Sequence, residues 1–399
     1  RKTKSGIKQL FIPGMLFEEM GIIYLGPVDG SDMKGILRLL KEASNIEGPV
    51  MVHVLTHKGA GYLPAERHPA RFHGTEPFDI ETGLPSKPRV KANYTDIFST
   101  VMRKLGDRDE KVVAITAAMT DGTGLKRFHN MFPGRFFDVG IAEEHAVTFA
   151  AGLAAAGLKP IFAVYSSFLQ RAYDQILHDV CIQNLPVVFA IDRAGLVGSD
   201  GETHQGIFDI SYLSAIPNMT IMAPKNKWEL SDMIKYAVDF PTPIAVRYPR
   251  GEAYDGLKEY RQPISVGKSE WIYRESEIAL VALGSMVKTA EKVHAALREE
   301  GIPASLINSR FAKPLDTQML MEAASKHTLV VTMEENVING GFGEHITRFY
   351  NEQGIYVNVL NIAIPDEYVE HGNVDILYHE VGIDADTILK RIKEVYHPL

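Results

Sequence analysis

Cysteine is almost missing from this sequence, whose 399 residues include a single one, Cys181. One thiol excludes a disulfide within the chain and is typical of proteins from a reducing compartment. Cys181 lies in a helical pattern, which favours a packed thiol over a nucleophile. We therefore expect a cytoplasmic protein without disulfides.

Long apolar runs and an excess of positive charge are also absent. No apolar run approaches the ~20 residues that span a membrane, and the first residues carry no signal-peptide pattern. The formal net charge is −8 and no basic cluster stands out, whereas surfaces that bind nucleic acid are basic. Neither a membrane nor a nucleic acid is an expected partner.

Motifs for metals and nucleotides are missing as well. His178, Cys181 and His204 lack the spacing of metal ligands. The run Glu-Glu-His at 143–145 directs its side chains to different faces of a helix. The single Gly-x-Gly at Gly122 is a weak signal, and no Walker or dinucleotide signature occurs. No metal site is therefore expected among these residues.

Short apolar strands that alternate with helical patterns are what the sequence has in quantity. Hydrophobic residues make up 45% and charged residues 23%, ordinary values for a globular chain. Because short apolar strands alternate with helices, we predict an α/β fold with a doubly wound, mostly parallel sheet. The strand candidates are VVAIT (112–116), RFFDVGI (135–141), PIFAVY (160–165), PVVFAID (186–192), MTIMAP (219–224) and PIAVRY (243–248).

The length predicts two or three domains. Residues 90–252 hold the doubly wound sheet, and residues 253–399 contain a smaller α/β domain of the same class. Residues 1–89 are the tail of a further α/β domain, with a helix that Ser31 or Asp32 can cap. Within them the segment 58–83 shows no periodicity, but its aromatic residues argue against disorder.

Two adjacent glutamates, Glu143 and Glu144, follow a short strand and open a helix of small apolar residues. Carboxylates in the first turn of a helix suit its dipole, which would explain both. Alternatively, one of them is a buried acid at a strand-to-helix junction, where open α/β sheets bind ligands. The stretch by itself leaves both explanations open.

A loop with four glycines, residues 192–206, follows a buried strand. Loops on rigid scaffolds carry function disproportionately, and the candidates here are Arg193, Asp200 and His204. Arg250 ends the last strand of the same sheet and could form, with Arg193, a fork for a phosphate or carboxylate. A long surface loop, with Arg250 capping a carbonyl, explains the same residues equally well.

A further group of candidates opens the helix predicted at 166–183. Tyr165, Phe168 and Arg171 could line the same cleft as the loop. Phe168 also continues a core stripe at helical spacing, and the residues alone favour the core for it.

Seven segments occur in order along the chain and together resemble the 1-deoxy-D-xylulose-5-phosphate synthases, a family of the thiamine-diphosphate-dependent transketolase group. THQG followed by FD, together with FLQRAYDQ, separates the sequence from transketolase itself. The segments are GPVDGSD (26–32), KGAGY (58–62), FHGTEPFD (72–79), DVGIAEEHAVTFAAGLA (138–154), YSSFLQRAYDQILHDV (165–180), DRAGLVGSDGETHQGIFD (192–209) and YPRG (248–251).

The resemblance implies a transketolase-like fold of a diphosphate-binding, a pyrimidine-binding and a C-terminal domain. Residues 1–89 match the tail and linker of the first domain, 90–252 the second and 253–399 the third. The magnesium motif of the family would lie upstream of Arg1. We therefore expect a C-terminal fragment, or one half of a nicked enzyme whose partner is its own N-terminal fragment.

The resemblance also implies the reaction, in which pyruvate and D-glyceraldehyde 3-phosphate give 1-deoxy-D-xylulose 5-phosphate and carbon dioxide. Thiamine diphosphate and Mg²⁺ are the expected cofactors and a homodimer is the expected assembly. The helix face formed by Ala146, Ala150, Ala154 and Gly157 could pack against that second copy or within its own domain.

Site residues follow from the resemblance position by position. Glu143 would hydrogen-bond the aminopyrimidine of the cofactor and Phe168 would stack on it, with Tyr62 and Lys58 nearby. Arg193 and Arg250 would hold the phosphate of the aldehyde. The residues expected around the substrates are Tyr165, Arg171, Asp200, His204 and His73.

Two other functions are compatible with parts of the sequence. The beta subunit of a 2-oxo acid dehydrogenase also pairs a pyrimidine-binding with a C-terminal domain, but residues 58–83 argue against it. A non-catalytic transketolase-like scaffold is the second alternative. The joint presence of Glu143, His204, Arg193 and Arg250 argues against a scaffold, which has no need of that set.

Overall fold

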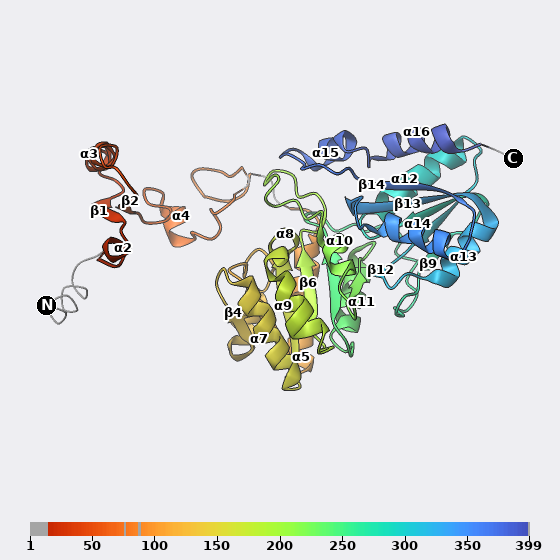
Figure 1. The fold of residues 1–399 in the computed structure, drawn as a ribbon, viewed down its shortest axis with the longest axis horizontal. Coiled ribbons are helices and arrows are strands. Elements are labelled where there is room, and N and C mark those ends of the chain that lie inside the picture. Colours follow the sequence, from red (N-terminus) through yellow and green to blue (C-terminus); the bar gives the residue numbers. More distant parts are fainter. Residues whose placement is uncertain (1–14, 76, 87–88, 398–399) are drawn as a thin grey trace. The chain divides into compact units, whose positions relative to one another are not determined.

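The computed structural model describes residues 15–75, 77–86 and 89–397, so the basic opening residues 1–6 lie outside the described range. The chain separates into two compact units, residues 1–89 and 90–399, and each is described by itself. Figure 1 shows the ribbon of both units and labels many of their elements.

The first unit is built on two parallel strands joined by a helix. That helix begins at a predicted cap, because the Asp32 carboxylate accepts a hydrogen bond from the Gly35 N–H at 2.9 Å. The irregular segment folds around Tyr62, Phe72 and Phe78, whose ring centroids lie 5.1–5.8 Å apart. The elements are α2 (Met15–Glu19), β1 (Ile23–Asp29), α3 (Met33–Ala43), β2 (Val50–Leu55) and α4 (Leu63–Arg67).

The second unit contains a seven-stranded sheet in the order β12-β7-β8-β6-β5-β3-β4. Its pairings are parallel except for β12 at one edge. This confirms the predicted doubly wound sheet. The strands are β3 (Val112–Thr116), β4 (Phe136–Asp138), β5 (Lys159–Tyr165), β6 (Val188–Asp192), β7 (Thr220–Met222), β8 (Ile244–Tyr248) and β12 (Phe311–Lys313).

Helices cover both faces of this sheet because its strands are apolar on both faces. Val188 and Ala190 of β6 join a core with α5 (Tyr94–Arg108) and α11 (Lys227–Ala237). Phe189 and Ile191 face the other way, into a core that includes helices on the opposite face. Those helices include α7 (Glu143–Ala155) and α10 (Asp209–Ser214); α6 (Lys126–Met131) and the turn η1 (Pro133–Arg135) precede β4.

The prediction of one regular helix over 166–183 is wrong. The hydrogen bonding of this segment changes from α to 3₁₀, returns to α and ends in a π-helix. Ala172, Ile176 and Val180 are fully buried as expected, whereas Phe168 is half-buried. The pieces are α8 (Ser166–Leu169), η2 (Gln170–Ala172), α9 (Tyr173–Gln175) and η3 (Ile176–Cys181).

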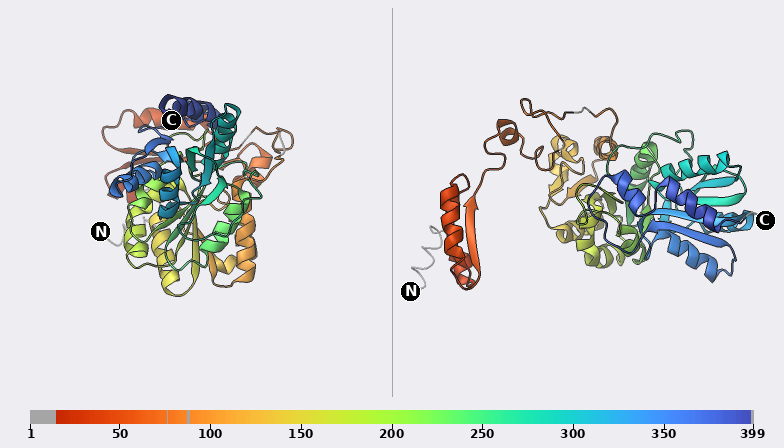
Figure 2. Two further views of the ribbon diagram at one scale, coloured as in Figure 1. Left: turned by 90° about the vertical axis from the view of Figure 1, so that its right-hand side faces the viewer. Right: turned by 90° about the horizontal axis from the view of Figure 1, so that it is seen from above.

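A five-stranded sheet in the order β14-β13-β10-β11-β9 forms the remainder of the second unit. The two figures agree that its helices lie on both faces (Figures 1 and 2). The strands are β9 (Glu270–Tyr273), β10 (Glu277–Ala282), β11 (Ala304–Asn308), β13 (His327–Val337) and β14 (Asn358–Ile364). The helices are α12 (Met286–Glu299), α13 (Thr317–Lys326), α14 (Phe342–Glu352), α15 (Val374–Glu380) and α16 (Ala385–Val395).

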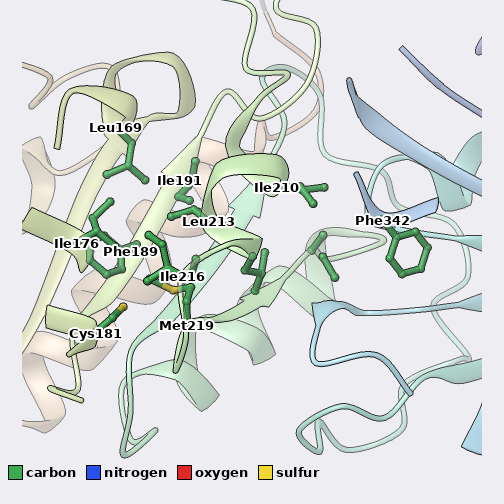
Figure 3. Packing of buried hydrophobic residues seen from close by; sticks show 14 of the residues in the cluster. Leu169, Ile176, Cys181, Phe189, Ile191, Ile210, Leu213, Ile216, Met219 and Phe342 are labelled. Carbon is green, nitrogen blue, oxygen red and sulfur yellow. The ribbon is translucent and has the colours of Figure 1, made fainter. Parts of the chain in front are cut away.

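The two sheets share one apolar core, so the second unit is continuous across them. Phe189 and Ile191 of β6 belong to the same buried cluster as Phe342 of α14 (Figure 3). Ala146 and Ala150 of α7 are fully buried in that cluster, so these small residues pack within their own domain. Cys181 is buried there too, and burial raises its pKa to about 12, as expected for a packed thiol.

Candidate active site

Three strands end side by side at the carboxyl edge of the seven-stranded sheet. Tyr165 of β5 is in register with Asp192 of β6, and Asp192 with Tyr248 of β8. Each strand is followed by candidate residues, so the topology gathers segments that lie far apart in the sequence. This is the edge at which open α/β sheets bind ligands.

Glu143 is the buried member of the glutamate pair. It is 1% exposed in the first turn of α7, whereas Glu144 is exposed. The Arg171 guanidinium donates to Glu143 Oε1 at 2.5 Å, and its carbon lies 4.7 Å from the ring centroid of Phe168. The structure thus joins Glu143, Arg171 and Phe168 in one cluster.

Phe168 belongs to both the core and the site. Its ring packs against the apolar cluster below α7 and stacks on Tyr165, with centroids 5.6 Å apart. The ring of His204 meets it edge-on at 5.2 Å. The predicted core position of Phe168 was therefore incomplete, since its ring also contacts His204 and Arg171.

Arg193 is held firmly at the start of the 193–206 loop. Its backbone adopts a φ of 61°, and its guanidinium lies 3.8 Å from the ring centroid of Tyr165. Its Nη1 donates to the Gly122 carbonyl at 2.8 Å. A Cβ atom at Gly122 would come within 1.7 Å of the Tyr165 hydroxyl, so the weak Gly-x-Gly signal marks a close approach to the site.

Asp192 is a site residue that sequence reasoning did not single out. It is completely buried, lies 3.0 Å from Arg193 Nη1 and accepts a hydrogen bond from the Thr95 hydroxyl. Burial raises the pKa of Asp192, while the Arg193 charge opposes that rise. Beside it the Tyr248 hydroxyl is buried without a hydrogen-bond partner. The signal that could have found Asp192 is its place as the last residue of a fully buried strand.

Arg250 and Asp200 form an ion pair at this edge, with Nη1 and Oδ2 2.6 Å apart. Arg250 and Arg193 both act on the pKa of Tyr165, which burial raises and these two cations lower. The two arginines thus lie near one ring, as the predicted fork requires. Each already has a partner, Gly122 for Arg193 and Asp200 for Arg250, so anion binding by the pair stays a prediction.

The candidates of the first unit lie near one another in that unit. Lys58 Nζ is 3.0 Å from His73 Nδ1, and the Tyr62 hydroxyl donates to the Ile80 carbonyl at 2.8 Å. A hollow of about 920 Å³ at the carboxyl ends of β1 and β2 is lined in part by Asp29, His57 and Tyr62. Their roles toward a cofactor or substrate stay predictions.

The described residues contain neither a metal-binding cluster nor a membrane-spanning helix. No cluster of three or more His, Cys, Asp or Glu side chains that could hold a metal ion occurs in the part of the chain that the structure describes. Over the same residues, no helix is both long and apolar enough to cross a membrane.

Comparisons with known proteins first define the class. The family described as "Transketolase, pyrimidine binding domain" matches residues 90–255, and "Transketolase, C-terminal domain" matches residues 267–388. A solved structure titled "Split gene transketolase, inactive beta4 tetramer" is 25% identical, covers 77% of this chain and 98% of its own, and has a TM-score of 0.67. A transketolase from Campylobacter jejuni shares the fold at 16% identity, covering 96% of this chain and 68% of its own (TM-score 0.64). The chain is a transketolase-type protein.

Further comparisons identify a narrower family within this class. The description "1-deoxy-D-xylulose-5-phosphate synthase" matches residues 1–56. Proteins of that name from Lachnoclostridium phytofermentans and Caldanaerobacter subterraneus are 56% and 50% identical, over 98% and 99% of this chain. The chain belongs to the 1-deoxy-D-xylulose-5-phosphate synthase family. It spans 63% and 64% of the length of these two relatives.

Proposed function

We propose that this chain is the pyrimidine-binding and C-terminal part of an enzyme that makes 1-deoxy-D-xylulose 5-phosphate. The reaction joins pyruvate to D-glyceraldehyde 3-phosphate and releases carbon dioxide. It is the first step of non-mevalonate isoprenoid synthesis and also feeds thiamine and pyridoxal synthesis. The observation that carries the proposal is the buried Glu143 carboxylate, bound to Arg171 at the carboxyl edge of the sheet.

Thiamine diphosphate is the proposed cofactor, and when bound it supplies a thiazolium carbon acid and an electron sink. The residues present fit its aminopyrimidine end. Arg171 donates a hydrogen bond to Oε1 of Glu143, which leaves Oε2 to share a proton with a ring nitrogen of the aminopyrimidine. The half-buried ring of Phe168 offers an apolar face on which a flat heterocycle can stack. Tyr62 and Lys58 are proposed to contribute from the first unit.

Arg193 and Arg250 are the proposed holders of the substrate phosphate. A guanidinium has five N–H donors in a fixed plane, so each arginine keeps donors beyond the Nη1 that Gly122 or Asp200 occupies. A phosphate at Arg250 would compete with Asp200 for the same cation. Binding of the aldehyde is therefore coupled, in this proposal, to release of Asp200 from Arg250.

The remaining assignments orient the two substrates and move protons. Tyr165 and Arg171 would fix the groups beside Phe168, and His204 would donate or accept a proton at an oxygen of the substrates. Asp200 would join them once it leaves Arg250, and His73 would act from the first unit. Holding the reacting groups together is the main contribution of these side chains.

Further parts of the proposal concern the whole protein. Mg²⁺ is expected to bind the cofactor diphosphate through ligands outside these 399 residues, since carboxylate and amide oxygens suit it. A cytoplasmic homodimer is proposed. The domain limits proposed from the sequence are 1–89, 90–252 and 253–399.

One observation favours a second candidate, an inactive scaffold. The split-gene transketolase that aligns over 98% of its own length is titled an inactive tetramer. These 399 residues would then be silent without a partner polypeptide. If release of carbon dioxide from pyruvate required lipoamide, the chain would instead be a subunit of a 2-oxo acid dehydrogenase.

The deciding experiment measures carbon dioxide and sugar phosphate formed by the full-length protein from pyruvate and D-glyceraldehyde 3-phosphate. We expect product only when thiamine diphosphate and Mg²⁺ are both added, and loss of product in Glu143→Gln. The isolated 399 residues serve as the comparison, and we expect poor thiamine diphosphate binding from them by calorimetry. A full-length protein that releases no carbon dioxide under these conditions would contradict the proposal.

A further inference from the structure

The 193–206 loop, which carries Arg193, Asp200 and His204, is held from the C-terminal sheet. The Leu196 N–H donates to Glu335 Oε1 at 2.7 Å. Farther along the loop, Gln205 Nε2 donates to the Glu370 carbonyl at 3.1 Å, and the Gly372 N–H donates to the Gly198 carbonyl at 3.3 Å. Of these three attachments, only the first uses a charged acceptor.

Glu335 joins three segments through one carboxylate. It lies in β13 and is 1% exposed. Besides Leu196, it accepts a hydrogen bond from the Ser285 hydroxyl at 2.5 Å, just before α12. Burial and then the Glu335 charge raise the pKa of Tyr378 in α15. A buried carboxylate is costly unless donors surround it. Glu335 thus binds the loop to the segment that begins α12, because each of its buried oxygens requires a donor.

The base of the loop is shaped around this carboxylate. The Gly195 and Gly206 backbones bond to each other in both directions, at 2.6 and 2.8 Å, and close the loop. Gly195 has a φ of 91°, and a Cβ atom there would lie 2.2 Å from the Glu335 carboxyl carbon. Arg193 is only two residues away, so a shift of this base moves its guanidinium relative to Tyr165.

We propose that Glu335 is a positioning residue of the active site, through which the C-terminal domain fixes the 193–206 loop and the side chains it presents. Glu335 acts through Leu196 and touches no reacting group. The catalytic consequence rests on the proposed function, whereas the attachment of the loop does not. If the carboxylate only stabilised the fold, its loss would lower the free energy of unfolding without selectively changing the loop or the Michaelis constant.

The adjacent residue provides a matched control. Glu334 has the same 1% exposure, but its oxygens accept from the Phe342 and Gly343 N–H groups at the start of α14, each at 2.8 Å. Shortening either side chain by one methylene keeps the carboxyl group and removes a buried contact. Glu335→Asp withdraws the carboxylate from Leu196, while Glu334→Asp withdraws it from α14.

The first measurement is amide hydrogen exchange at Leu196 in the 399-residue chain. Glu335→Asp should raise the exchange rate of this amide about tenfold or more, as expected when a local hydrogen bond is lost without global unfolding. Glu335→Gln retains an oxygen for Leu196 and should stay close to the parent rate. Glu334→Asp should leave the rate at Leu196 unchanged. Equal rates in parent and Glu335→Asp would overturn the proposal.

The second measurement is steady-state kinetics of the full-length protein with pyruvate and the aldehyde. Glu335→Asp should lower kcat/KM for the aldehyde about ten- to a hundredfold, with a raised KM. Glu335→Gln should keep most of the kcat/KM of the parent. Equal losses in Glu335→Asp and Glu334→Asp would reduce Glu335 to a structural role. If the parent makes no sugar phosphate, the proposed function fails, and hydrogen exchange still decides the positioning role.

Discussion

The pH dependence of stability should report directly on Glu334. Burial raises the pKa of this carboxyl from 4.5 to about 7, although the Gly343 and Phe342 N–H groups and Arg247 favour its charged form. Between these two values the folded protein keeps a proton that the unfolded chain has lost. The contribution of Glu334 to the free energy of unfolding therefore falls as the pH rises through this window, and is largest below the unfolded pKa.

The magnitude follows from the size of the shift. The difference between 4.5 and about 7 is roughly 2.5 pH units, and each unit is worth about 1.4 kcal/mol, so the full effect is about 3–4 kcal/mol. Part of it is already lost at pH 5. Between pH 5 and pH 8 the contribution of Glu334 should therefore fall by about 2–3 kcal/mol.

The assay is urea unfolding of the 399-residue chain at several pH values from 5 to 8. The two tryptophans of the sequence, Trp228 and Trp271, both lie in the second unit, so their fluorescence reports that unit. The comparison is with Glu334→Gln, which cannot titrate and loses one acceptor at every pH. The free energy of unfolding of this variant should lack the fall with pH that Glu334 causes in the parent. The lost acceptor should lower it by a nearly constant amount at every pH.

Two histidines contribute to the pH dependence with the opposite sign. Burial lowers the pKa of His294 and of His345, so the unfolded chain binds protons there that the folded chain does not, and their contribution to stability rises with pH toward 6.5. Parent and variant share both histidines, and this part cancels in the difference between them. Identical pH slopes in parent and Glu334→Gln would refute the assignment of the raised pKa to Glu334.

Three further predictions concern the full-length protein. Glu143→Ala should nearly abolish turnover with the fold intact by circular dichroism, while Glu144→Ala should not; matching activities would sink the proton-relay role. Arg250→Ala should weaken binding of the phosphorylated aldehyde by the ~1.5–3 kcal/mol of a charged hydrogen bond and raise its KM accordingly. An unchanged KM would count against the phosphate site. Gly122→Ala should push Tyr165 aside and lower kcat/KM at least about tenfold, whereas Gly152→Ala, which meets nothing within 4 Å, should keep parent activity.

The strands could be predicted from the sequence because their chemistry is local. β3, β6 and β8 are fully buried, and such strands read as continuous apolar runs. The place of the 193–206 loop followed from topology, since parallel strands end at one edge. The composition of 166–183 could not disclose its change to 3₁₀ and π hydrogen bonding, because these forms share the same side-chain types.

Long-range pairing of charges was beyond sequence reasoning. Lys225 is buried between Glu229 and Glu270, which are 3.1 and 2.6 Å away, and Arg310 contacts the same two acids. Charged residues are usually exposed, so nothing in the local pattern marks these four as internal. Their partners come from segments as far as 81 residues apart, and only the folded chain brings them together.

The two glutamate pairs show how local geometry decides which segment each acid contacts. Successive residues of a helix are rotated by about 100°, so at the start of α7 Glu143 is buried and Glu144 is exposed. Successive residues of a strand point to opposite faces, and both faces of β13 are covered, so Glu334 and Glu335 are both buried. Glu334 meets α14, whereas Glu335 meets the loop that begins at Arg193. A paired glutamate in this fold therefore acquires a role from the segment that covers its face, which is why Glu334 is the appropriate control for Glu335 and Glu144 for Glu143.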